Sequence, residues 1–213
     1  MTGRHDSKGF TLIELMFAMA FVSFLMIFIV TSIVQTMRIY NKGLAIRDIN
    51  QSGRQLSEEM TRTLRYANAQ QFAAGGDRTA NQRICANGVS YVWNIETVAG
   101  LSTTNKYSGA DASIPIRFIR VDDRSGSLCA VPTSAVTKSQ SRDLLGAQLA
   151  LQRLTLSTSE AGRVVTIKAL ISTQGNNRPS NSATSPSGFE CPTGGDGAFC
   201  AFGDFPTTVY IRN

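Results

Sequence analysis

The stretch KGFTLIELMFAMAFVSFLMIFIVTSIV, from Lys8 to Val34, decides the fold of this chain. After Lys8 it carries no charged residue except Glu14. A helix of these residues, about 25 in number, rises about 37 Å at about 1.5 Å per residue. That length crosses a hydrocarbon layer of about 30 Å with some tilt. The sequence therefore predicts one membrane-spanning helix close to the N-terminus.

The flanks of this stretch distinguish it from a secretory signal peptide. The polar leader MTGRHDSKG precedes it and carries Arg4, Lys8 and His5, the chain's one histidine. A cationic flank before an apolar run stays in the cytoplasm, so the residues after Val34 are expected on the outer side. A signal peptide places its small-residue cleavage site after the apolar region. Here the small residue is Gly9, which lies before the apolar run, and the helical pattern continues beyond Val34.

Glu14 is a carboxylate inside the apolar segment. An acidic group at the centre of a membrane helix costs about 2.5–3.5 kcal/mol on insertion scales, and such residues usually have a functional partner. The alternative is a plain single-span anchor that tolerates a glutamate near its end.

The run from Lys8 to Met16 resembles the processing and assembly motif of type IV pilins and type II secretion pseudopilins. The resemblance implies that a prepilin peptidase cuts between Gly9 and Phe10 and methylates the new amino group of Phe10. It also implies that Glu14 pairs with the N-terminal amine of a neighbouring subunit. The α-amino group titrates near 7.7–8 and is largely cationic at neutral pH. A cation and an anion that meet among apolar helices offset each other's burial cost.

The chain has 213 residues and a formal net charge of +6. Removal of residues 1–9 leaves 19 basic and 14 acidic residues, or a net charge of +5. This excess is spread along the chain without a run of lysines and arginines, which favours a solvated surface over a nucleic-acid site. Nucleic acid is therefore not an expected partner, although a DNA-binding pilin for DNA uptake is kept as a rival function.

All four cysteines, Cys85, Cys129, Cys191 and Cys200, lie beyond the apolar segment. An exported domain is in a compartment where disulfides persist, and four cysteines allow three pairings. Cys191 and Cys200 flank a glycine-rich loop that closes easily, and Cys85 would then pair with Cys129. Zinc is not expected, since the spacing is not C-x-x-C and no histidine follows the leader.

A helical period continues after Val34. One apolar face is predicted at Ile46, Ile49, Leu56, Met60, Leu64 and Ala67, with charged residues between them. Gly43 and Gly53 are each expected to weaken the helix by about 1 kcal/mol relative to alanine. The helix is predicted to end near residues 68–72, before a run of alanine and glycine.

The remaining residues predict a β-rich head. Strands are expected at 89–95, 114–121, 149–157, 163–172 and 205–213, with Val165, Ile167, Ala169 and Ile171 facing the helix. A turn at 122–126 is expected to lead into a strand at 127–131, which carries Cys129. Asp122 and Asp123 are interpreted as turn residues rather than metal ligands. Residues 175–188 form a serine-, asparagine- and proline-rich loop that is expected to be exposed.

The chain is thus expected to be an α+β protein with a pilin-like architecture. Its segments are a leader (1–9), a transmembrane or filament-core helix (10–34), an amphipathic helix (35–72) and an exported head with two disulfides (73–213). A coiled coil is the alternative for the helical part, but the amphipathic stretch covers only about three heptads.

No catalytic motif is present in the sequence, so an enzyme is not expected, nor is a cofactor or a metal. The resemblance implies a filament subunit that spans the inner membrane once, with its head in the periplasm or outside, before it joins a pilus. Its partners are then other pilins or pseudopilins, the prepilin peptidase and an inner-membrane assembly platform. The run 54–67 and the ending 208–213 resemble large minor pilins and J-type pseudopilins, which favours a minor subunit. A secretion pseudopilin and a tip adhesin remain open as alternatives.

Overall fold

A computed structural model describes residues 9–68, 82–97, 100–130, 136–159, 163–175, 178–183, 185–186, 188–193, 197 and 199–212, except the side chains of 129 and 130. The chain forms two compact units, residues 1–41 and 42–213. The leader residues Arg4, His5 and Lys8 lie outside the described residues.

One long helix, α1 (Leu12–Arg65), begins in the first unit and ends in the second. Its apolar part contains several hydroxyl side chains, each of which donates to a carbonyl of the preceding turn. Ser23 bonds Met19 at 2.8 Å, Ser32 bonds Phe28 at 2.8 Å and Thr36 bonds Ser32 at 2.9 Å. These polar groups are therefore satisfied inside the helix, as an apolar environment requires.

The first unit has no protein core among its described residues. Residues 9–40 are all exposed, including Phe10, Phe17, Phe24 and Ile39. An 18-residue window of α1 has a mean hydropathy of 2.6, and by length and composition the helix is able to span a membrane. Apolar side chains in this number need lipid or other helices around them.

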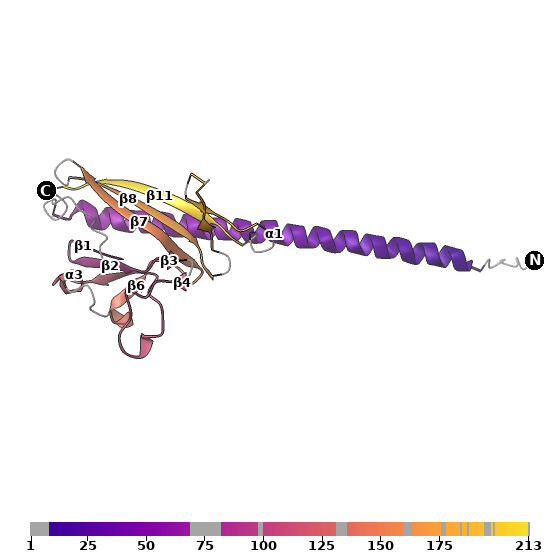
Figure 1. Ribbon diagram of the computed structural model, residues 1–213, viewed down its shortest axis with the longest axis horizontal. Coiled ribbons are helices and arrows are strands. Elements are labelled where there is room, and N and C mark those ends of the chain that lie inside the picture. Colours follow the sequence, from indigo (N-terminus) through magenta and orange to yellow (C-terminus); the bar gives the residue numbers. More distant parts are fainter. Residues whose placement is uncertain are drawn as a thin grey trace, which may run out of the picture. The chain divides into compact units, whose positions relative to one another are not determined.

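The second unit combines the rest of α1 with antiparallel strands (Figure 1). The strands are β1 (Arg83–Ala86), β2 (Val89–Trp93), β3 (Glu96–Thr97), β4 (Gly100–Leu101), β5 (Phe118–Asp122), β6 (Ser141–Asp143), β7 (Leu149–Ser159), β8 (Val164–Thr173), β9 (Ser180–Asn181), β10 (Phe189–Glu190) and β11 (Phe202–Tyr210). Short helices are η2 (Gly109–Asp111), α3 (Ser127–Ala130) and η3 (Lys138–Gln140). One sheet has the order β1-β2-β5-β6 and another β11-β8-β7, while β9 pairs with β10 and β3 with β4.

The main core joins α1 to both larger sheets. Its buried side chains include Ile49, Leu56, Met60, Leu64, Tyr91, Trp93, Phe118, Leu154, Val165, Ile167, Ala169 and Ile171. The predicted inward face of β8 is thereby confirmed. A smaller core lies on the other side of β2 and β5, around Val92, Ile119 and Val136. Both faces of these two strands are therefore covered by protein.

A close approach fixes β11 against α1. Gly53 is buried in the helix, and a Cβ at this position would overlap the ring of Phe205. Gly43 differs, because a Cβ there would meet nothing within 4 Å. The two glycines, which look alike in the sequence, thus have different structural reasons to be present.

Several sequence-based boundaries are wrong. α1 ends at Arg65, a few residues before the predicted end, and Ile46 is 44% exposed rather than part of the buried face. The strand expected from Ile114 begins at Phe118, and the last strand is β11, which ends at Tyr210.

Residues 127–130 are helical instead of a strand, because Asp123 accepts the first backbone N–H groups of this turn. The 175–188 segment includes the short strand β9, and Pro179 within it is buried.

Candidate assembly and processing site

The site predicted at the start of the apolar helix is built by a reciprocal cap. The Glu14 backbone N–H donates to Thr11 Oγ1 at 3.4 Å, while Thr11 donates to Glu14 Oε2 from its backbone N–H at 3.4 Å and from its hydroxyl at 3.2 Å. This is a capping box, in which a threonine and a glutamate three residues apart satisfy orphan N–H groups of the first turn. The carboxylate also lies near the positive end of the helix dipole.

Glu14 therefore also caps the helix, a local role that was not predicted from the sequence. The T-x-x-E spacing from Thr11 to Glu14 is the sequence signal for such a box. The box holds the carboxylate at the first turn, close in the chain to Gly9 and Phe10. Glu14 is exposed, as are the apolar residues around it. Its carboxylate is therefore accessible to a group from another molecule.

Gly9 has no structural reason to be glycine in the fold described here. A Cβ built at Gly9 meets nothing within 4 Å, and its φ is not in the left-handed region. Phe10, which follows, is 84% exposed. The packing of the chain therefore does not require a glycine at this position.

Cysteines of the head are disulfide-bonded, as the sequence predicted. Cys191 and Cys200 form a disulfide with a Cα–Cα distance of 5.7 Å, as expected from the loop between them. Cys85 is also disulfide-bonded. Its expected partner, Cys129, has a side chain outside the described part, so the Cys85–Cys129 pairing stays a prediction.

The acidic turn after β5 is occupied by its own backbone. Asp123 accepts from Ser127 N–H at 3.1 Å, Leu128 N–H at 2.9 Å and Ser90 Oγ at 2.9 Å. Burial alone would raise the pKa of Asp123, but these hydrogen bonds outweigh it and hold the pKa below its usual value. Among the described residues no group of three or more histidine, cysteine, aspartate or glutamate side chains is placed to hold a metal.

Polar groups also connect α1 to the first sheet. Arg120 on β5 places Nε 3.0 Å from Glu59 Oε1 and Nη2 2.9 Å from Asp122 Oδ1. Tyr91 donates its hydroxyl to Thr63 Oγ1 at 2.7 Å, and burial raises the pKa of Tyr91 to about 12. These contacts fix the helix on the head.

A second buried network was not foreseen from the sequence. Asn94 Nδ2 donates to the carbonyl of Asn105 at 2.8 Å, and Arg83 Nε donates to Asn105 Oδ1 at 2.7 Å. Burial lowers the pKa of Arg83. Both asparagines are at most 1% exposed, so the network is a structural support rather than an accessible site.

Comparison with known proteins agrees with the geometry at the N-terminus. Residues 4–30 match the family model described as the prokaryotic N-terminal methylation motif. No curated protein and no solved structure matches the chain.

The motif, together with one long apolar helix and antiparallel sheets, supports assignment to the type IV pilin and pseudopilin family, with an α+β pilin-like fold. The family is structural. The motif implies processing by a prepilin peptidase and assembly with other subunits, and with the apolar helix it fits a membrane anchor that later joins a filament.

Proposed function

We propose that this chain is a structural subunit of a type IV pilus, in a minor or tip position, and not an enzyme. It enters the inner membrane as a prepilin, with residues 1–9 as the leader and the head in the periplasm. It is cut between Gly9 and Phe10, N-methylated on Phe10 and then assembled through the apolar helix. The observation that carries the proposal is the isolated carboxylate of Glu14, held by Thr11 at the first turn of an exposed apolar helix.

The physical argument concerns burial in the filament. When apolar helices pack together, Glu14 is removed from water, and an unpaired buried charge is expensive. The amine of Phe10 on a neighbouring subunit is a cation of matching depth, and it exists only after cleavage. Assembly is thereby restricted to processed subunits, because the leader form lacks that amine at Phe10.

Substitution of Glu14 tests this role. Glu14→Leu and Glu14→Gln are expected to leave insertion, cleavage and head folding intact, but to lower incorporation into filaments. The reason is that breaking a buried ion pair from one side costs about 3–5 kcal/mol. Membrane and sheared-filament fractions of the wild type and both variants are compared by immunoblot. Equal filament content in all three would reduce Glu14 to a helix cap.

Processing is tested separately. Gly9→Leu is expected to block cleavage, so the protein stays in the membrane at its full 213 residues. Gly43→Leu is the matched control, since both glycines lie in open surroundings. Recovery of an N-methylated form beginning at Phe10 from the Gly9 variant would contradict the assignment of the site.

A pseudopilin of a type II secretion system is the second candidate, because the same N-terminal motif serves both machines. Genes for an outer-membrane secretin and secreted enzymes beside this one would favour secretion, and a retraction ATPase would favour a pilus. The minor position is favoured by the large head and by the long polar segment from 175 to 188, which would crowd a closely packed shaft. Mass spectrometry of sheared filaments measures the abundance of the subunit directly.

A further inference from the structure

The surface of α1 that faces away from the core carries a row of arginines. An α-helix turns about 100° per residue, so positions 47, 54 and 65 lie within about 20° of one line, and position 62 lies about 60° from it. The buried positions Ile49, Leu56, Met60 and Leu64 lie on the opposite side. The name arginine face is used here for Arg47, Arg54, Arg62 and Arg65, all of which are exposed.

These arginines have no acidic partners in the described part of the chain. The ion pairs found there join Arg120 to Glu59 and Asp122, Lys138 to Asp111, and Arg178 to Glu96. Glu59 is turned inward to Arg120. Along residues 42–65 of α1, the exposed acidic residues are Asp48 and Glu58, against four exposed arginines, so this side of the helix has an excess of positive charge.

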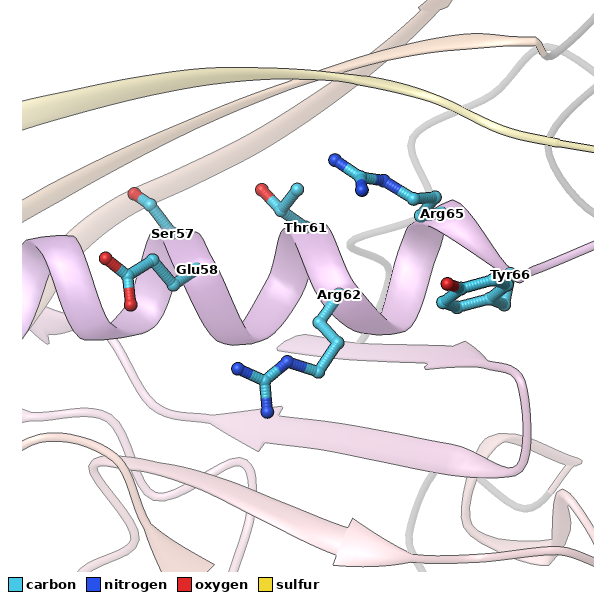
Figure 2. Close-up of a pocket in the computed structure, with 6 residues that line it drawn as sticks. All are labelled: Ser57, Glu58, Thr61, Arg62, Arg65 and Tyr66. Atoms are coloured by element: carbon cyan, nitrogen blue, oxygen red, sulfur yellow. The ribbon is translucent and has the colours of Figure 1, made fainter.

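The surface is also hollowed along its length. One hollow of about 470 Å³ is lined by Arg47, Asn50, Gln51, Arg54, Gln55 and Glu58. A second hollow of about 460 Å³ is lined by Ser57, Glu58, Thr61, Arg62, Arg65 and Tyr66. In Figure 2, Ser57, Thr61 and Arg65 point to one side of α1 and Arg62 to the other, with Tyr66 at the end. Glu58 lines both hollows, which makes them one continuous surface.

We propose that the arginine face binds an acidic strip on a different subunit of the same filament. This inference rests on the proposed function as a filament subunit. Arginine guanidinium groups bind carboxylates in a bidentate geometry. Charge complementarity of this kind selects partners and fixes their register more than it adds raw affinity.

Among the residues that the structure describes, the exposed carboxylates of the chain form no strip that would complement the arginine face in a second copy. Asp111 and Asp122 are already paired with Lys138 and Arg120. The other exposed carboxylates in the described strands are dispersed, one each on β6, β10 and β11, at Asp143, Glu190 and Asp204. Two copies meeting through the arginine face would oppose like charges, which is unfavourable.

A protein surface fits this face better than a nucleic acid does. Glu58 lies between Arg54 and Arg62, four residues from each, and Asp48 lies next to Arg47. A phosphate backbone presents only negative charge and would meet both carboxylates. A subunit surface with mostly acidic and a few basic side chains satisfies the whole pattern.

The test uses the full chain in cells that build the filament. Arg47→Glu/Arg54→Glu reverses two charges in the middle of the helix, away from its last turn. Arg153→Glu/Lys168→Glu, on exposed positions of β7 and β8, is the matched control with the same change in net charge. Folding is checked by the amount of each variant in the membrane and by its disulfide state. Glu14→Leu gives the level expected for failed assembly.

The face variant is expected to lower filament content about tenfold, and the control variant to stay within about twofold of the wild type. A photo-crosslinking residue at Gln51 is expected to join a different prepilin-type subunit, through a peptide rich in aspartate and glutamate. Reversal of those acidic residues to lysine should restore the face variant.

Three results would overturn the inference. The face variant could have the filament content of the wild type, the residue at Gln51 could cross-link only to a second copy of this chain, or it could cross-link to DNA. The first two leave the proposed function intact if the wild type is present in filaments. Absence of the wild-type chain from filaments would instead defeat the proposed function together with the inference.

Discussion

The carboxylate of Glu14 illustrates how one residue serves two environments. Before assembly it completes the first turn of α1 through Thr11, and in a filament it is proposed to meet a neighbouring amine. The hydroxyl of Thr11 donates to the carboxylate at 3.2 Å, so Thr11 positions Glu14 without itself carrying charge.

Thr11→Val is expected to destabilise the first turn by about 1 kcal/mol, because it removes the cap acceptor while keeping the shape of the side chain. Amide hydrogen exchange of residues 12–16 in detergent micelles measures this loss. Thr11→Ser keeps the hydroxyl and is expected to restore protection. Equal exchange in the wild type and Thr11→Val would show that the cap contributes nothing in a membrane-like environment.

Two helix glycines give a second prediction at the scale of single residues. Gly53→Ala is expected to destabilise the head by roughly 1–3 kcal/mol, since the new methyl overlaps Phe205 and β11 must shift. Gly43→Ala meets nothing within 4 Å and should instead raise stability by up to about 1 kcal/mol. Thermal unfolding of both variants provides the comparison, and shifts of the same sign would contradict the close approach at Gly53.

At the scale of elements, the turn between β5 and α3 depends on the charge of Asp123. Its pKa is lower in the folded state than in the unfolded chain, so its contribution to stability is present above the unfolded value of about 3.9. That contribution is lost as the pH falls from there through the folded pKa. Burial raises the pKa of Asp143, which gives a dependence of the opposite sign, so the wild type alone is not diagnostic.

Asp123→Asn isolates the effect of Asp123. The wild type is expected to be more stable than this variant at pH 6–7, with a difference that shrinks once the pH falls below about 4. Urea unfolding of both proteins at several pH values measures the difference. A gap that stays constant down to the lowest pH would mean that the turn does not need the ionised carboxylate.

Some strands and turns were predicted from the sequence and others were missed, depending on the strength of the local sequence pattern. Alternation in Val165, Ile167, Ala169 and Ile171 was strong enough to predict β8 and its buried face. The hairpin of β1 and β2 was missed, although Asn87-Gly88 is a strong turn signal and both residues have positive φ. The turn signal at 122–126 suggested a hairpin with a strand at 127–131, but capping by Asp123 favours a short helix there.

For the candidate site as well, local features can be predicted from the sequence, whereas contacts between distant residues cannot. The motif around Gly9 and Glu14 is local, so nine residues of sequence suggest it, and the family model matches there; the roles of Gly9, Phe10 and Glu14 stay predictions. The Asn94–Asn105 network and the Arg120–Glu59 pair join residues far apart in the chain. Such contacts depend on the register of the strands, which periodicity alone does not determine.

At the scale of the whole molecule, the two units require different surroundings. Residues 1–41 expose apolar side chains, and residues 42–213 form their own core. One chain therefore combines a helix able to span a membrane with a head that folds around its own core. The Cys191–Cys200 disulfide is the kind of bond that persists in an oxidising compartment.

The last prediction concerns these cysteines. The exported protein is expected to be lighter than its reduced form by about four hydrogens, since each disulfide removes two. Peptide mapping should link Cys191 to Cys200, as in the structure, and Cys85 to Cys129. In the chain-entropy model the short Cys191–Cys200 loop contributes up to about 3 kcal/mol, and a loop of about 45 residues contributes about 4 kcal/mol. Cys85→Ala/Cys129→Ala should therefore lower the unfolding temperature of the head more than Cys191→Ala/Cys200→Ala does. A larger loss of stability in Cys191→Ala/Cys200→Ala would mean that the Cys85–Cys129 disulfide strains the folded head. Free thiols at all four positions would contradict export of the head.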